Sequence, residues 1–204
     1  MVQIRRIKMI PLMNLDRQYA SLQEQLDEAA LKVLHSGNYI LGEEVTEFEK
    51  EFANYCGVKY AVGVGNGTDA LIIALQACGI KPGDEVITCA MSFFATAEAI
   101  GIVGATPVFV DCKKDTFVID SAKIEEKITN KTKAIIPIHL YGQCAEMDEI
   151  KNIAKKYNLK VIEDAAQAAG AEYKGKKAGA MGDVGCFSFF PTKNLGCAGD
   201  GGII

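Results

Sequence analysis

The amino-acid sequence predicts an α/β fold with a mostly parallel sheet flanked by helices. Segments typical of strands and of helices alternate about five times along the chain. The strand segments are continuous apolar runs rather than alternating ones, which indicates a sheet that is covered on both faces. With 204 residues, 49% of them hydrophobic, the chain is long enough to bury a sizeable core.

Two amphipathic helices are expected first. Leu22, Leu26 and Val33 recur at helical spacing within residues 17–35, and the segment 43–57 repeats this pattern. The glycine-punctuated stretch "HSGNYILG" separates the two helices. The elements expected next are a strand at 60–65, a helix at 68–79, a turn and strand at 81–90, a helix at 92–104 and a strand at 106–111.

The second half of the chain continues the alternation. A helix is expected at 120–129, capped by Asp120 or Ser121. The elements expected after it are a strand at 132–140, a helix at 146–158, a strand at 159–165 and a short strand with its turn at 183–194. The last residues, "GDGGII", are typical of the opening of one more strand.

No repeat, linker or low-complexity segment divides the chain. We expect an N-terminal segment and the start of the first helix at 1–25. A single large domain then follows at 26–204, incomplete at its C-terminus.

The composition argues against several classes of protein. A net charge of −4 is not that of a nucleic-acid binder. No apolar run reaches membrane length, because Glu98 interrupts the longest candidate, and the start of the chain does not match a signal peptide. The seven cysteines are odd in number and show no CxxC spacing, which argues against a metal site or a disulfide framework and fits a reducing cytoplasm.

A glycine-rich turn stands between an apolar run and an apolar helix in "AVGVGNGTDALIIAL", residues 61–75. Gly63 and Gly65 match the first two glycines of a dinucleotide-binding fingerprint, but Thr68 stands where the third is required. The lysine of a nucleoside-triphosphate loop is also missing. The turn therefore matches neither kind of nucleotide site.

Two interpretations of this turn remain open. The N–H groups of Gly67, Thr68 and Asp69 open a helix whose dipole favours an anion such as a phosphate. Alternatively, the segment is only a tight turn with Asn66 or Thr68 as the helix cap.

Two further segments carry candidate groups. Asp164 ends the strand at 159–165, where ligands bind in open parallel sheets, and Gln167 follows three residues later. Ser188 and Lys193 lie in the aromatic-rich stretch "GCFSFFPTKNLG". Taken singly, Asp164 is interpreted as a helix-capping carboxylate and Lys193 as a solvent-exposed loop lysine. Together with the phosphate cup they are the set that pyridoxal 5′-phosphate needs: a lysine for its aldehyde, an acid for its ring nitrogen and donors for its phosphate.

The motifs "GNGTDAL", "ATAEAI", "HLYGQ", "VIEDAAQA" and "CFSFFPTKNLG" closely resemble the DegT/DnrJ/EryC1/StrS family, from about Pro11 to the last residue. The resemblance implies the large domain of a fold-type-I pyridoxal-phosphate transferase, with the family's smaller C-terminal domain absent from this chain. It also implies an aminotransferase that acts on nucleotide-linked keto-sugars.

The resemblance assigns roles to individual residues. Lys193 would be the Schiff-base lysine and proton carrier, and Asp164 would pair with the pyridinium nitrogen. Gln167 would face the ring's 3-oxygen, and Phe93 would stack on the ring. The residues expected around the phosphate are Gly67, Thr68, Asp69 and Ser188. For His139, which matches the family pattern, a packed residue at a strand end is the favoured interpretation.

Two functions follow as hypotheses. The first is transfer of an amino group, by family analogy from glutamate, to a keto-sugar nucleotide, with a 3-keto favoured over a 4-keto sugar. This enzyme would be a cytoplasmic homodimer without nucleic-acid or membrane partners. The alternative is a truncated, non-catalytic relative with a cofactor-binding, regulatory or interaction role.

Overall fold

The computed structural model describes residues 10–204. The expectation of no signal peptide rests partly on residues 1–9, which lie outside the described part. The chain separates into two compact units, one ending at Glu44 and one spanning Val45–Ile204. Each unit is described by itself.

The N-terminal unit contains the first predicted helix, α1, at Leu15–Ser36. Its start is capped by Asn14, whose side-chain oxygen accepts a hydrogen bond from the Arg17 N–H at 3.1 Å. Its end is set by Gly37, which adopts a left-handed backbone with φ of 67°. The prediction of an amphipathic helix over 17–35 is confirmed.

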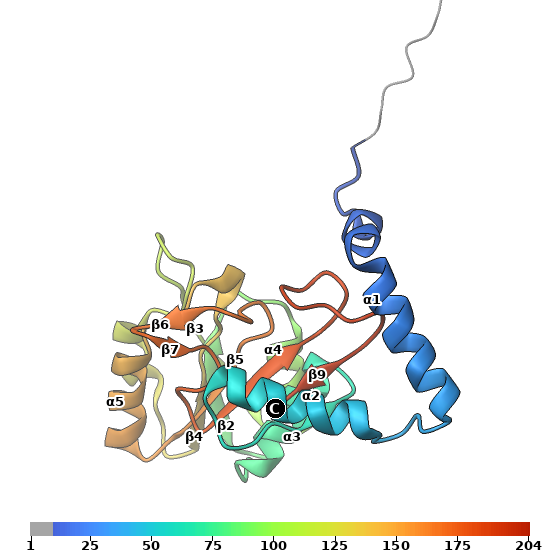
Figure 1. Ribbon diagram of the computed structural model, residues 1–204. Coiled ribbons are helices and arrows are strands. Elements are labelled where there is room, and N and C mark those ends of the chain that lie inside the picture. The colour runs from blue at the N-terminus through green and yellow to red at the C-terminus, as the bar shows by residue number, and fades with distance from the viewer. Residues whose placement is uncertain (1–9) are drawn as a thin grey trace, which may run out of the picture. The chain divides into compact units, whose positions relative to one another are not determined.

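The second unit, which Figure 1 includes, is built on a seven-stranded sheet, and its strand order is β1-β9-β8-β5-β4-β2-β3. The five strands from β8 to β3 pair in parallel, whereas β9 is antiparallel to both β8 and β1. The prediction of a mostly parallel sheet is confirmed. The strands are β1 (Gly63–Val64), β2 (Glu85–Cys89), β3 (Thr106–Val110), β4 (Thr132–Ile136), β5 (Lys160–Asp164), β8 (Val184–Ser188) and β9 (Gly202–Ile203).

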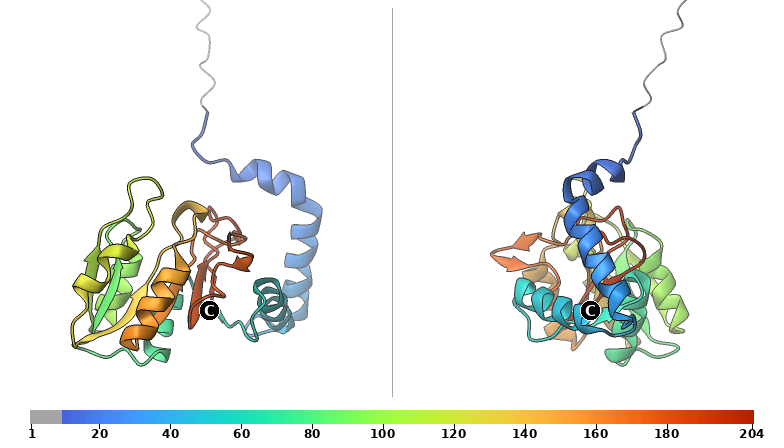
Figure 2. Two further views of the ribbon diagram at one scale, coloured as in Figure 1. Left: turned by 90° about the vertical axis from the view of Figure 1, so that its left-hand side faces the viewer. Right: turned by 45° about the vertical axis from the view of Figure 1, so that its right-hand side comes forward.

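Helices flank this sheet, as the views in Figure 2 show. They are α2 (Glu43–Cys56), α3 (Gly67–Ala77), α4 (Ala95–Ile102) and α5 (Met147–Tyr157). Successive strand residues point to opposite faces. On β5, Val161 packs in the core that includes residues of α2 and α5, and Ile162 packs in the core shared with α3 and α4. Burial on both faces explains why the strands read as continuous apolar runs.

One predicted helix is wrong in type. Residues 120–129 form two short 3₁₀ helices, η1 (Ser121–Lys123) and η2 (Glu125–Lys127), closed by bonds to the third residue back. Tertiary contacts hold this tighter geometry: Ile124, between the two turns, is fully buried, and the Ser121 hydroxyl donates to Glu149. Asp120 caps η1, as one of the two predicted alternatives.

A small hairpin was not predicted. It pairs β6 (Glu172–Tyr173) with β7 (Lys176–Lys177). Lys174 and Gly175 both have positive φ, 51° and 78°, which is the backbone of a two-residue hairpin turn. A third 3₁₀ turn, η3 (Leu140–Gly142), follows β4.

All seven cysteines are free thiols. Within residues 10–204, no cluster of three or more histidine, cysteine or acidic side chains could hold a metal ion. Over the same residues, no helix has the length and apolar character that a bilayer crossing requires.

Candidate active site

A cavity of about 630 Å³ opens where β5 and β8 end and where α3 and α4 begin. This is the edge of a parallel sheet at which ligands bind. Residues from several separated segments of the sequence meet here. The cavity lining includes every site residue predicted from the sequence: Gly67, Thr68, Asp69, Phe93, Asp164, Gln167, Ser188 and Lys193.

The start of α3 forms one wall. Asn66 caps the helix, with its side-chain oxygen accepting from the Asp69 N–H at 2.8 Å and its amide donating to the Asp69 carboxylate at 3.1 Å. Asn66 rather than Thr68 is therefore the cap, and the Asp69 N–H is already bonded to the Asn66 side chain. The N–H groups of Gly67 and Thr68 have no helical carbonyl to bind, which leaves them for an anion in the cavity.

Gly67 lies directly against Ser188, at the end of β8. A β-carbon at Gly67 would stand 2.7 Å from the Ser188 Cβ and 3.2 Å from its Oγ. Only glycine therefore lets the helix start approach this close. The approach brings two N–H groups and the Ser188 hydroxyl to one small space, which suits the several oxygens of a phosphate.

Asp164 is the buried acid of the cavity, with 6% of its surface exposed. Its Oδ2 accepts from the Thr96 hydroxyl at 2.7 Å, and its Oδ1 accepts from the Ala166 N–H at 3.2 Å. Burial raises the pKa of the Asp164 carboxyl, and these two hydrogen bonds oppose the rise. Thr96 comes from the first turn of α4 and was missed in the sequence, although it lies within the motif "ATAEAI".

Lys193 is half-buried in the turn after β8, where its backbone N–H donates to the Phe190 carbonyl at 2.8 Å. Lys193 lines the same cavity as Asp164.

The orientation of Gln167 follows from one contact. The Tyr141 N–H lies 3.1 Å from the Gln167 Oε1, and because an N–H can only donate, the amide oxygen must point toward Tyr141. The amide NH₂ is then turned the other way, as a donor. Tyr141 holds this position with a strained φ of 55°.

Phe93 stands at the mouth of the cavity, before α4. Its ring packs against Phe94 with centroids 4.9 Å apart and remains 62% exposed. A ring face that is still accessible can stack on a flat ligand.

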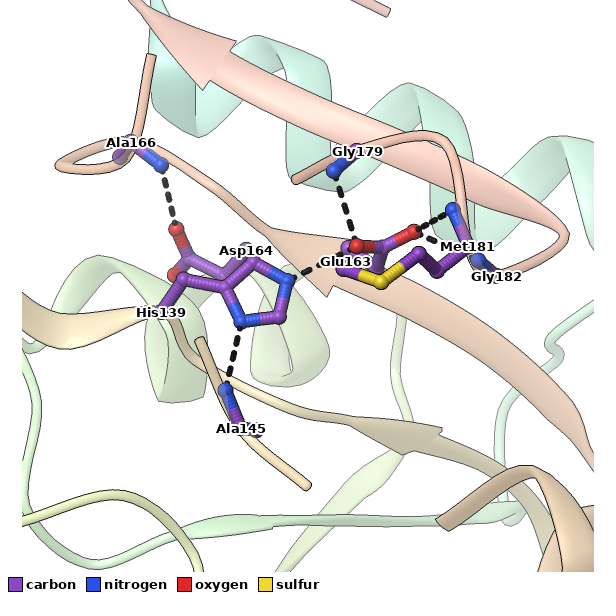
Figure 3. A network of polar contacts seen from close by, with 8 residues as sticks. All are labelled: His139, Ala145, Glu163, Asp164, Ala166, Gly179, Met181 and Gly182. Atoms are coloured by element: carbon purple, nitrogen blue, oxygen red, sulfur yellow. Dashed lines mark hydrogen bonds and ion pairs between the residues drawn. The ribbon is translucent and has the colours of Figure 1, made fainter. Parts of the chain in front are cut away.

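Behind the cavity lies a buried polar network (Figure 3). Glu163 accepts from the N–H groups of Gly179, Met181 and Gly182 and from His139. Burial favours a higher pKa for Glu163, but the bonds from His139 and the glycine N–H groups outweigh it and hold the pKa below its usual value.

His139 is fully buried and bonded on both ring nitrogens, to Glu163 and to the Ala145 N–H. This agrees with the packed residue favoured in the sequence. The role of Glu163 was missed. The sequence did carry a signal for it: Glu163 lies inside an apolar strand, and a buried acid needs hydrogen-bond partners.

The model of one protein family, the DegT/DnrJ/EryC1/StrS aminotransferase family, matches residues 20–204. This match covers most of the chain.

The chain belongs to this family.

Curated relatives agree. The chain is 53% identical over 195 residues to a pleiotropic regulatory protein of Geobacillus stearothermophilus, covering 96% of this chain and 52% of the relative. It is 50% identical over 196 residues to UDP-2-acetamido-2-deoxy-3-oxo-D-glucuronate aminotransferase of Pseudomonas aeruginosa, covering 96% and 55%. The chain thus spans about half the length of the curated relatives it matches.

Solved structures share the fold. DesV of S. venezuelae, in complex with a ketimine intermediate, superposes with a TM-score of 0.93 at 46% identity over 95% of this chain and 52% of that one. NtdA of Bacillus subtilis, with bound cofactor PMP, gives 0.90 at 41% identity over 99% and 46%. The predictions of the fold-type-I large domain and of pyridoxal phosphate as the family's cofactor are confirmed.

Proposed function

We propose that this chain is the cofactor-binding part of a pyridoxal-phosphate-dependent aminotransferase that converts a nucleotide-linked keto-sugar to an amino-sugar. The observation that carries the proposal is the meeting of Asp164, Lys193 and the Gly67–Ser188 cup in one cavity. These groups are distant in sequence, and each has a reason to face the same small molecule.

The residues present fit this cofactor. The cup at Gly67, Thr68 and Ser188 would hold the phosphate, and Phe93 would cover one face of the ring. Asp69 would contribute through the cap that orders the helix start, because its N–H is already bonded to Asn66. When bound, the cofactor supplies an aldehyde that a lysine amine can capture and a ring that withdraws electrons from the carbon being deprotonated.

The side chains divide the remaining work. Asp164, whose ionised form its two donors favour, would accept a hydrogen bond from the protonated ring nitrogen and keep that nitrogen charged. Gln167 would donate its NH₂ to the ring's 3-oxygen. Lys193 Nζ would hold the aldehyde, give up that bond to the incoming amine, and as the freed amine would then carry a proton from one carbon to the other, acting as both base and acid.

The substrate class comes from relatives. The Pseudomonas aeruginosa relative is named for a 3-oxo sugar nucleotide, which supports a 3-keto substrate. Glutamate as amino donor and a cytoplasmic homodimer are proposed from the family resemblance.

The test is a transamination assay against a panel of 3-keto and 4-keto UDP- and dTDP-sugars. Both the 204-residue chain and the product of the complete reading frame should be assayed. We expect the product of the complete reading frame to consume glutamate with a 3-keto sugar and to lose this activity in Lys193→Ala. Covalent capture of pyridoxal phosphate by Lys193→Ala, detected by borohydride reduction and mass spectrometry, would overturn the assignment.

A regulatory role is the second candidate, because a relative of 53% identity is named a pleiotropic regulatory protein. A product that binds the cofactor but aminates no sugar in the panel would favour it.

A further inference from the structure

Asp164 and Glu163 are adjacent acids on β5 with different surroundings. Glu163 is fully buried and accepts four hydrogen bonds, which fill the usual acceptor positions of a carboxylate. Asp164 accepts two in the described structure, from Thr96 and Ala166. It therefore keeps acceptor positions unused and lines the cavity.

Of the two donors to Asp164, Thr96 makes the shorter bond, at 2.7 Å against 3.2 Å for Ala166. Thr96 is 2% exposed and belongs to the first turn of α4. A hydroxyl in a buried site strengthens the charged form of a carboxylate more than it would in water.

Ser92 extends this contact into a chain with a defined direction. Its Oγ lies 3.1 Å from the Thr96 Oγ1. Because Thr96 has one hydroxyl proton and gives it to Asp164, its oxygen must accept from Ser92. The order of donation is therefore Ser92 to Thr96 to Asp164, and successive bonds of this kind polarise one another.

We propose that Thr96, supported by Ser92, is a positioning residue that keeps Asp164 ionised and turned toward the ring nitrogen of the cofactor. The proposal rests on the proposed function, since it takes Asp164 as the partner of that nitrogen. Burial alone pushes the pKa of Asp164 upward, and a neutral Asp164 would no longer hold the ring nitrogen protonated.

The test uses the full chain loaded with pyridoxal phosphate carrying ¹⁵N at the ring nitrogen. The variants are Thr96→Val, which keeps the shape and removes the hydroxyl, and Thr96→Ser, which restores it. The matched control is Thr88→Val on β2: Thr88 is equally buried, and its hydroxyl donates to the Ile136 carbonyl at 3.0 Å, outside the cavity lining.

We expect Thr96→Val to shift the ¹⁵N signal toward the unprotonated ring and to raise the cofactor Kd roughly tenfold, as for one lost hydrogen bond to a charged group. Thr96→Ser should restore the wild-type signal, and Thr88→Val should leave it unchanged. A wild-type signal in Thr96→Val would overturn the inference while leaving the proposed function intact.

If Thr96→Val does not fold, Ser92→Ala gives the second measurement. It removes only the outer hydroxyl and should produce a smaller shift in the same direction, and no shift would overturn the inference. Wild-type protein that binds no pyridoxal phosphate would overturn the proposed function together with this one.

Discussion

Glu163 and His139 form a fully buried pair, with 2.8 Å between Oε2 and Nε2. The Ala145 N–H donates to the other ring nitrogen at 3.1 Å, so Nδ1 carries no proton and Nε2 is the donor to Glu163. The pair ties three parts of the chain together: the end of β4, strand β5 and the loop before β8 (Figure 3). The loop leads directly into β8, the strand that ends in Ser188.

Glu163→Gln should destabilise the protein by about 2–4 kcal/mol, because the new amide NH₂ faces N–H donors that then lack an acceptor. Urea denaturation measures the loss. The matched control is Glu126→Gln at an exposed side chain, which should change the free energy of unfolding by less than about 0.5 kcal/mol. Equal, small effects in both variants would show that the network contributes little.

The stability that Glu163 contributes should depend on pH. The folded pKa of Glu163 lies below its usual value of 4.5, so its contribution to stability is present above that pH and is lost as the pH falls toward the folded pKa. The stability difference between wild type and Glu163→Gln should therefore be constant near neutral pH and shrink below 4.5. A difference that grows on acidification would contradict the ionised Glu163.

Gly67→Ala should block the phosphate cup. Its β-carbon would stand 2.7 Å from the Ser188 Cβ, so the helix start must move away from β8. We expect the Kd for pyridoxal phosphate to rise by about tenfold or more. Fluorescence titration measures this change. Gly101→Ala in α4 is the control: nothing lies within 4 Å, and alanine should stabilise the helix by about 0.5–1 kcal/mol without changing the Kd.

Lys193→Ala should lower transamination by at least about 10²–10⁴-fold, since it removes the group that moves the proton. Lys176→Ala, an exposed lysine of the β6–β7 hairpin, is the control and should keep wild-type rates. Initial rates at saturating donor measure both. Comparable losses in the two variants would argue against Lys193 as the reacting amine.

Gln167→Glu keeps an oxygen that can accept from the Tyr141 N–H but replaces the NH₂ donor with a second oxygen. If the NH₂ faces the ring's 3-oxygen, repulsion should weaken cofactor binding by roughly tenfold or more at neutral pH. Isothermal titration with pyridoxal phosphate tests this. Unchanged affinity would place the amide away from the cofactor.

Much of the fold was predictable because apolar periodicity is a local property. The strand expected at 159–165, from its apolar residues and the acid at its end, is observed at Lys160–Asp164. The segment at 120–129 was not predictable, because buried Ile124 and the Ser121–Glu149 contact select the 3₁₀ geometry. Contacts between distant residues leave no local pattern.

The α/β class, the family and the groups that gather at the cavity follow from the sequence, because they depend on side-chain chemistry and on spacing along the chain. How those groups are held follows from the packing of the folded chain. The structure shows Gly67 against Ser188, Thr96 donating to Asp164, and Tyr141 orienting Gln167. Each of these contacts joins segments that come together only when the sheet and its helices pack. Burial then strengthens the hydrogen bonds among them.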